Sequence, residues 1–255
     1  MKTAFVVLGM HRSGTSSVAG LLALLGATPP RTLMGAKPEN PKGFWESEVL
    51  MAFDDEILTR AGSSWDDAEP LDQSVFRGEQ GDDLRRRAGE KLHEEFGGAD
   101  TIVIKDPRIC RFYPFWREVL IAAGYEPFVV IPVRDPAEVA ASLHARNGMA
   151  VEEGLKLWRR HVEDAEAATR GQRRHVLIWR DLLDDWRSAV TALSKDLGRP
   201  LHGDESEIID FLDPSASLHS GQADLNRDTS SSRLYARIKL LAATPDSAST
   251  TSRRL

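Results

Sequence analysis

Residues 3–25 constrain the fold more than any other part of the chain. Residues 3–8 form a short apolar run rich in β-branched side chains, which predicts a buried strand. A loop bounded by Gly9 and Gly14 follows at once. One face of a helix is then marked by Val18, Leu21, Leu22 and Leu25. This order is typical of a phosphate-binding turn, because glycines let the backbone turn tightly while free N–H groups and the helix dipole attract an anion.

The loop differs at one position from the nucleotide-binding pattern G-x-x-x-x-G-K-[ST]. Thr15 stands where that pattern has lysine, and Arg12 lies inside the loop instead. A nucleoside triphosphatase uses the lysine, together with a metal ion, on its outer phosphates. The loop therefore suits a phosphate-bearing donor that needs no metal. An ordinary tight turn between strand and helix is the alternative for the glycines alone.

Strands and helices are predicted to alternate along the rest of the chain. Further strands are predicted over residues 101–104, 128–133 and 175–179. Helices are predicted over residues 45–60, 82–96, 112–123, 136–145, 151–170, 181–196 and 204–212. The pattern predicts an α/β fold of the P-loop type: three layers, with a central parallel sheet of about four to five strands flanked by helices. We expect one domain over residues 1–243 and a disordered tail over residues 244–255, which are rich in Ser and Thr.

The net charge and the cysteine content limit which partners and which cellular compartment the sequence favours. The formal net charge of −6 argues against nucleic acid or an anionic membrane as a partner, so an anionic ligand needs local cations. Residues 5–8 are too short an apolar core for a signal peptide, and no run approaches about 20 apolar residues, so no transmembrane helix is expected. Cys110 is the only cysteine, which favours a reducing, cytoplasmic location. No His, Cys, Asp or Glu cluster has metal-ligand spacing, so no metal is expected.

A second cationic motif follows the predicted third strand. Arg134 lies just past that strand, and Pro136 suits the first turn of a helix. Ser142 comes a little over two helical turns later, so it lies on about the same side as the helix start. An arginine fork and a hydroxyl can grip one phosphate. The alternative is a helix start with a surface arginine.

Together these segments resemble the sulfotransferases of bacterial type that use 3′-phosphoadenylyl sulfate (PAPS), over residues 5–212. Their donor loop is matched by Arg12-Ser13-Gly14-Thr15-Ser16. The resemblance implies that this loop binds the 5′-phosphate side of the donor, and that Arg134 and Ser142 bind its 3′-phosphate. Two anion sites fit a nucleotide with phosphates at both ends, which distinguishes PAPS from ATP.

The resemblance also implies a catalytic base. Relatives carry it in a Gly-aromatic-aromatic-Glu segment, here Gly43-Phe44-Trp45-Glu46. An acceptor hydroxyl has a high pKa, so a positioned base such as Glu46 assists its attack on sulfur. His11, inside the donor loop, is the rival base. For Glu46 the alternative is a carboxylate that the helix dipole favours at a helix start.

Three other segments carry weaker predictions. Lys105, at the end of the second strand with Arg108 nearby, either neutralises the sulfonate or forms a simple ion pair. Trp179-Arg180-Asp181-Leu182 differs from the family's Tyr-Glu-Asp-Leu, which leaves an adenine contact there open. Residues 213–219 resemble a loop that closes over the donor in relatives, although a plain loop is favoured because basic residues are few.

The sequence therefore predicts a PAPS-dependent sulfotransferase that modifies a hydroxyl of a small molecule, a saccharide or a glycosylated natural product and releases 3′-phosphoadenosine 5′-phosphate (PAP). Loops near residues 28–45 and 63–81 are expected to form the acceptor pocket. A P-loop kinase or nucleoside triphosphatase is one alternative, and a non-catalytic nucleotide-binding module is another. The sequence identifies neither the acceptor nor the oligomeric state.

Overall fold

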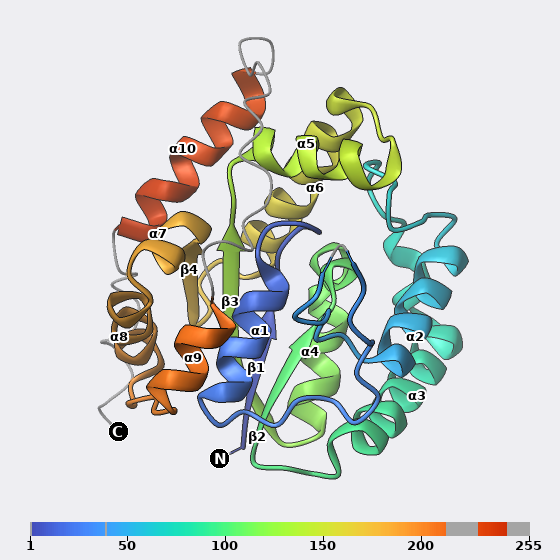
Figure 1. The fold of residues 1–255 in the computed structure, drawn as a ribbon. Helices are drawn as coiled ribbons and strands as arrows, with labels where there is room; N and C mark the ends of the chain where they lie inside the picture. The colour runs from blue at the N-terminus through green and yellow to red at the C-terminus, as the bar shows by residue number, and fades with distance from the viewer. Residues whose placement is uncertain (1, 39, 213–228, 244–255) are drawn as a thin grey trace.

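The centre of the protein is a sheet of four parallel strands (Figure 1). The computed structural model describes residues 2–38, 40–212 and 229–243. In this part of the chain the strands are β1 (Lys2–Val7), β2 (Thr101–Lys105), β3 (Tyr125–Val133) and β4 (Arg174–Ile178). Their order across the sheet is β2-β1-β3-β4, and every pairing is parallel. This confirms the predicted α/β architecture with its central parallel sheet.

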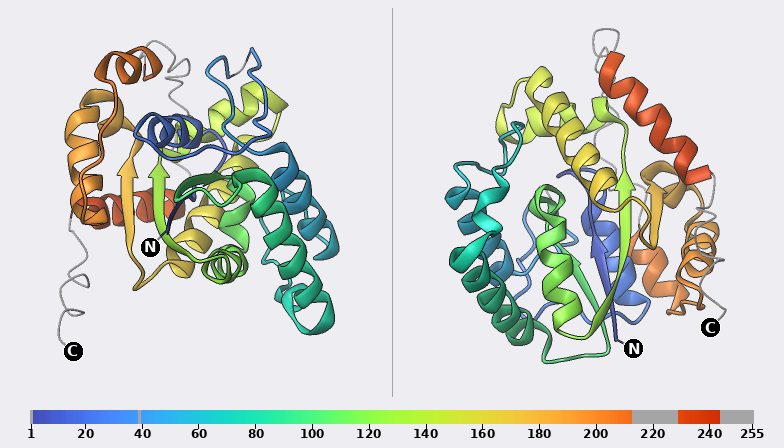
Figure 2. Two further views of the ribbon diagram at one scale, coloured as in Figure 1. Left: turned by 90° about the horizontal axis from the view of Figure 1, so that it is seen from below. Right: turned by 180° about the vertical axis from the view of Figure 1, so that it is seen from behind.

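Each strand is buried on both sides because helices cover both faces of the sheet. Phe5 and Val7 of β1 pack toward one face, whereas Ala4 and Val6 pack toward the other. The first face is covered by α1 (Thr15–Leu24), α8 (Trp186–Leu197) and α9 (Glu205–Phe211). The second is covered by α4 (Tyr113–Ala122) and α6 (Val151–Ala168), as Figure 2 shows from behind. Burial on both faces explains why the strands read as continuous apolar runs.

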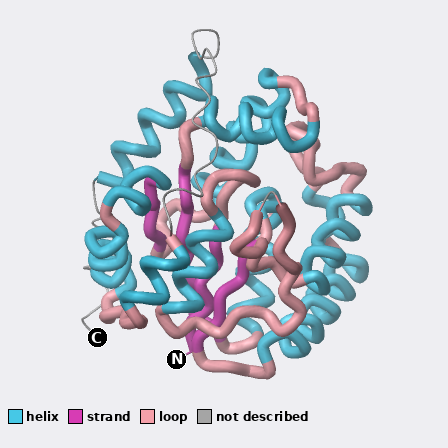
Figure 3. The backbone as a smooth tube through the Cα atoms, in the orientation of Figure 1, coloured by secondary structure: helices cyan, strands magenta, loops and turns pink. Residues whose placement is uncertain are grey.

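The remaining helices surround this three-layer core. They are α2 (Glu48–Arg60), α3 (Gly78–Phe96), α5 (Pro136–Asn147), α7 (Trp179–Asp184) and α10 (Thr229–Ala243), with the short 3-10 helices η1 (Gln73–Phe76) and η2 (Pro107–Arg111). A long loop joins α1 to α2 (Figure 3). It is tied to the core at Thr28, which forms a parallel bridge with Ile102 of β2, and at Thr32, whose N–H and hydroxyl both donate to the Glu95 carboxylate. None of the helices within the described ranges is both long and apolar enough to cross a bilayer.

The helix predicted from residue 45 begins later, at Glu48. Ser47 is its N-cap and accepts a hydrogen bond from the N–H of Leu50 at 3.0 Å. A serine cap with a bonded side chain fixes a helix start, and Trp45 has a left-handed backbone (φ 58°) that no helix accommodates. Glu46 therefore lies in the loop before α2, not in its first turn.

The helix predicted over residues 181–196 is two helices. Asp185 interrupts it with an extended φ of −150° and caps α8 through the N–H of Ser188. Trp179, predicted to end a strand, instead begins α7. Helix α10 was not predicted, because its apolar face is weak. The buried residues of this helix are only three: Ser231, Leu234 and Ile238. The predicted loop over residues 213–219 and the predicted tail over residues 244–255 lie outside the described residues.

Candidate functional site

The loop between β1 and α1 has the geometry of a phosphate cradle. Gly14 caps α1 with a left-handed backbone (φ 84°), and a Cβ there would lie 2.2 Å from the Trp179 ring. Only glycine fits such a position. The Ser13 hydroxyl is 1% exposed, and its oxygen has no hydrogen-bond partner among the described residues. Buried polar groups are nearly always satisfied, so an unpartnered buried hydroxyl is an unusual feature of this loop.

The loop after β1 meets the start of α5. The Arg12 Nε donates to Ser142 Oγ at 2.9 Å, and the Arg134 Nη1 donates to the Arg12 carbonyl at 3.3 Å. Arg134 also pairs with Glu138 at 2.7 Å. The structure thus places the two predicted anion-binding motifs side by side, at the end of the sheet where parallel-sheet proteins bind their ligands.

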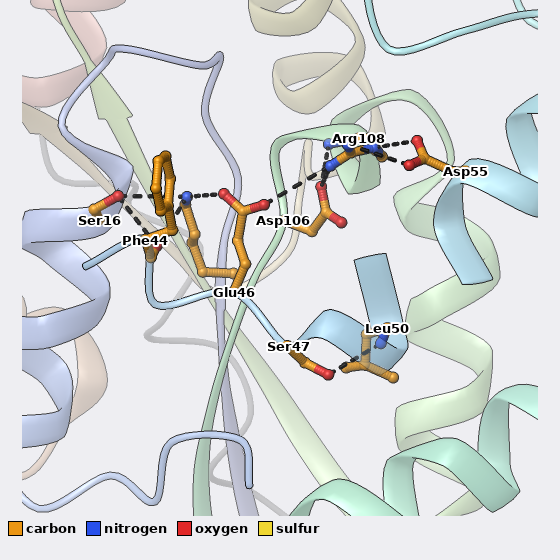
Figure 4. Close-up of polar contacts among 9 residues, drawn as sticks. Ser16, Phe44, Glu46, Ser47, Leu50, Asp55, Asp106 and Arg108 are labelled. Carbon is orange, nitrogen blue, oxygen red and sulfur yellow. Dashed lines mark hydrogen bonds and ion pairs between the residues drawn. The ribbon is translucent and has the colours of Figure 1, made fainter. Parts of the chain in front are cut away.

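A second polar group lies beside the first turn of α1 (Figure 4). Lys105, at the end of β2, forms a buried ion pair with Glu46, and each residue is 4% exposed. The Lys105 Nζ also donates to the Phe44 carbonyl at 3.1 Å and lies 3.5 Å from Ser16 Oγ. Lys105 therefore links the predicted base to the phosphate loop.

Arg108 lies behind this pair. Its Nη1 donates to Asp106 Oδ1 at 2.9 Å and lies 3.8 Å from Glu46 Oε2, and its Nε donates to Asp55 Oδ1 at 2.5 Å (Figure 4). Burial opposes the charge on Arg108, but the Asp106 and Asp55 carboxylates raise its pKa, so the guanidinium stays protonated. One carboxylate, Glu46, is thus faced by two fixed cations.

The two candidate bases differ in their electrostatics. Burial raises the pKa of Glu46, and the attraction of Lys105 and Arg108 only partly opposes this effect. Burial lowers the pKa of His11 well below its usual value, and the Arg108 charge lowers it further. The His11 ring packs edge-on against Trp65 at 5.0 Å between ring centroids. A useful general base has a pKa near the working pH, so these opposite shifts favour Glu46 over His11 as the candidate base.

Asp54 and Asp55 are two residues of this region that the sequence analysis missed. Both lie on α2, and Asp55 binds Arg108 while Asp54 is fully buried. A signal was present: Asp54 lies four residues after Leu50 and four before Leu58, so it shares the apolar face of its helix. A carboxylate on that face requires a buried partner. Over the described residues, no three His, Cys, Asp or Glu side chains gather as a metal site would require.

Comparison with known proteins adds a likeness in structure. No family model matches the chain, and no curated protein matches it. The sulfotransferase domain of the Synechococcus PCC 7002 olefin synthase matches with a TM-score of 0.57 and 16% identity, over 93% of this chain and 94% of that one. The sulfotransferase domain from the curacin biosynthetic pathway matches with a TM-score of 0.53 and 12% identity, over 94% and 98%. Sulfotransferase STF1 from Mycobacterium tuberculosis H37Rv matches with a TM-score of 0.50 and 15% identity, over 95% and 77%.

These structures are similar over nearly the whole of this chain, although few residues are identical. Because so few residues are identical, this similarity concerns the path of the backbone. Function depends on individual side chains, which the similarity does not compare. The similarity agrees with the resemblance that the phosphate loop and the Arg134 segment indicated. The protein therefore has the fold of the sulfotransferases.

Proposed function

We propose that the protein is a sulfotransferase that moves the sulfuryl group of PAPS to a hydroxyl of its acceptor. The observation that carries this proposal is a convergence at one end of the sheet. The phosphate loop, the Arg134 and Ser142 pair and the Glu46–Lys105 pair all lie there, joined by the contacts of Arg12 and of Lys105 with Ser16. A donor with phosphates at both ends and an acceptor that must lose a proton need these three groups together.

The donor contacts follow from the positions of the cations. Arg12 and the N–H groups from Ser13 to Ser16 hold the 5′-phosphate, where the helix dipole also favours negative charge. Arg134 and Ser142 hold the 3′-phosphate and set the register of the nucleotide. Support comes from the 3.3 Å contact between Arg134 Nη1 and the Arg12 carbonyl, because it keeps the two arginines within the span of one nucleotide.

Glu46 takes the proton of the acceptor hydroxyl as its oxygen attacks sulfur. A new bond forms between that oxygen and sulfur, while the bond from sulfur to the 5′-phosphate oxygen breaks and its electron pair leaves with PAP. Lys105 neutralises charge on the sulfuryl oxygens, and Arg12 neutralises charge growing on the leaving phosphate. Positioning and electrostatics supply most of the acceleration, as in phosphoryl transfer.

The acceptor is a hydroxylated small molecule, a saccharide or a glycosylated natural product. Two of the similar structures are sulfotransferase domains of an olefin synthase and of the curacin biosynthetic pathway, which supports a biosynthetic small molecule. Its pocket is formed by the loop before α2 and by residues 63–77, since residues 78–81, expected to be loop, begin α3. Trp65, beside His11 of the phosphate loop, supplies an aromatic surface there.

The discriminating measurement is thermal unfolding with different nucleotides. A ligand that binds only the folded protein at about 100 times its Kd adds about 2.7 kcal/mol, which raises the Tm of a chain of this size by roughly 5–10 °C. We expect PAP to produce such a shift, ADP to produce a much smaller one, and a metal chelator to change neither. A larger shift with ADP and Mg²⁺ would favour a kinase or nucleoside triphosphatase. A PAP shift without transfer from PAPS to any acceptor would favour a binding module.

Arg134→Ala should remove the selectivity for the 3′-phosphate. Loss of a charge-assisted contact is expected to weaken PAP about 10- to 150-fold and to leave AMP unchanged, measured by titration calorimetry. The variant should fold, because Glu138 keeps its ion pair with Arg180 at 2.9 Å.

Arg173→Ala is the matched control for this variant. Arg173 also pairs with a glutamate, Glu126 at 2.8 Å, but it precedes β4 at the opposite end of the sheet. Its loss should change neither affinity. Equal weakening of PAP and AMP by Arg134→Ala would place Arg134 away from the 3′-phosphate.

A further inference from the structure

Two buried aspartates lie behind the Glu46 and Lys105 pair. Asp54 of α2 is 0% exposed, and Asp106, which follows β2, is 2% exposed. Asp54 Oδ1 accepts from the Trp116 indole at 2.8 Å, and Asp106 Oδ1 accepts from the N–H and Nη1 of Arg108, both at 2.9 Å. The second oxygen of each, Oδ2, is buried and has no donor among the described residues. Two such oxygens would be costly if both carboxylates were charged.

The two carboxyl groups can satisfy each other. Asp55, the residue after Asp54 on α2, and Asp106 both bind the Arg108 guanidinium, which brings this part of α2 next to Asp106. Burial, followed by the negative charge of Asp106, raises the pKa of Asp54 well above its usual value. A proton on Asp54 Oδ2 turns that oxygen into a donor for Asp106, and the pair then carries one negative charge. Adjacent buried carboxylates share a proton for this reason.

The charges around the pair disfavour a second negative charge on it, because the two cations nearby already face two other carboxylates. Arg108 comes from η2, Lys105 from β2, Glu46 from the loop before α2, and Asp55 from α2. The neighbouring imidazoles of His11 and His161 are neutral, because burial and then nearby arginines lower their pKa values. With Asp54 protonated, Asp106 is the buried counter-ion of Arg108.

We propose that Asp54 and Asp106 share one proton and act as a positioning unit that holds the Arg108 guanidinium toward Glu46. Arg108 has two other anchors, but Asp55 is 47% exposed at its side chain and Glu46 must receive the acceptor proton. Among the described residues, Asp106 is the buried partner of the guanidinium that takes no part in the proposed reaction, and a proton on Asp54 would occupy its second oxygen. The shared proton stands independently, whereas the effect on turnover rests on the proposed function.

The shared proton is tested with Asp54→Asn. The amide oxygen can still accept from Trp116, and the amide nitrogen can donate to Asp106 without a titrating proton. We expect infrared difference spectra of the wild type to show the carbonyl band of a protonated carboxylic acid, and the variant to lack it. Unfolding of the wild type must release the proton. As the pH increases, the unfolding constant of the wild type should therefore rise about tenfold per pH unit relative to that of the variant, until the pH passes the folded-state pKa of Asp54. Identical spectra and parallel pH profiles would overturn the shared proton.

The positioning role is tested by comparing Asp54→Leu with Asp54→Asn. The leucine leaves Asp106 without its donor, so we expect kcat to fall at least tenfold while the Tm shift with PAP is retained; the asparagine should restore kcat. Normal kcat in a folded Asp54→Leu variant, or an equal loss in both variants, would overturn the role. If Asp54→Leu does not fold, the Asp54→Asn variant decides the question alone. A reduced kcat of Asp54→Asn would overturn the positioning role, and a wild-type kcat would support it. Absence of transfer by the wild type, with the carboxylic band present, would contradict the proposed function and the positioning role but leave the shared proton standing.

Discussion

Glu46→Gln is expected to lower kcat by about 10²- to 10⁴-fold, the usual contribution of a general base. Glutamine keeps an oxygen that can accept from Lys105, so the loop and the donor site should stay in place. The PAP-induced shift in Tm should therefore match that of the wild type. Steady-state kinetics with PAPS and a hydroxylated acceptor, next to thermal unfolding with PAP, separates loss of chemistry from loss of binding.

The pH profile gives a second signature of the same residue. Because burial raises the pKa of Glu46, its active, ionised form should be lost as the pH falls through a value above that of an ordinary glutamate. Activity of the wild type should show this acidic limb, and the residual activity of Glu46→Gln should not. His11→Asn is the matched variant for the rival base. Loss of turnover in His11→Asn, with Glu46→Gln active, would move the base to the phosphate loop.

The sequence predicted the sheet correctly, and it placed the candidate site residues at one end of that sheet, because both depend on local patterns. Continuous apolar runs marked strands that are buried on both faces, and the glycines of residues 9–14 marked the turn into α1. Parallel strands that follow one another through helices end at a common edge, so the positions of Lys105 and Arg134 just at strand ends indicate that both lie near the phosphate loop. Two of the boundaries that failed were decided by single capping residues, Ser47 and Asp185.

The contacts inside the site could not be predicted in the same way. The sequence left open whether Lys105 forms an ion pair, and nothing local shows that its partner is Glu46, 59 residues away along the chain. The buried Asp54 interrupts an apolar helix face, yet its partners Trp116 and Asp106 come from other elements. Such pairings are set by tertiary packing, which residue spacing does not encode.

Lys105→Met is expected to destabilise the protein by about 3 kcal/mol, because it leaves the buried Glu46 carboxylate with only the 3.8 Å contact to Arg108. Removing one partner of a buried ion pair costs about 3–5 kcal/mol, most of it the desolvation of the charge left behind. The free energy of unfolding in urea measures this loss. Arg31→Met is the matched control, since Arg31 pairs with Glu94 on the surface with side chains 64% and 50% exposed. That pair should contribute no more than about 1 kcal/mol.

The double variant Lys105→Met with Glu46→Leu separates stability from chemistry. It removes both buried charges, so most of the lost stability should return, as it does when a buried ion pair is replaced by apolar side chains. Turnover should remain absent, because the base and the cation that neutralises the sulfuryl oxygens are both gone. Stability that returns without activity would mean that this ion pair is kept for the reaction and not for the fold. A double variant less stable than either single variant would instead make Glu46 and Lys105 structural, and the base would have to be found elsewhere.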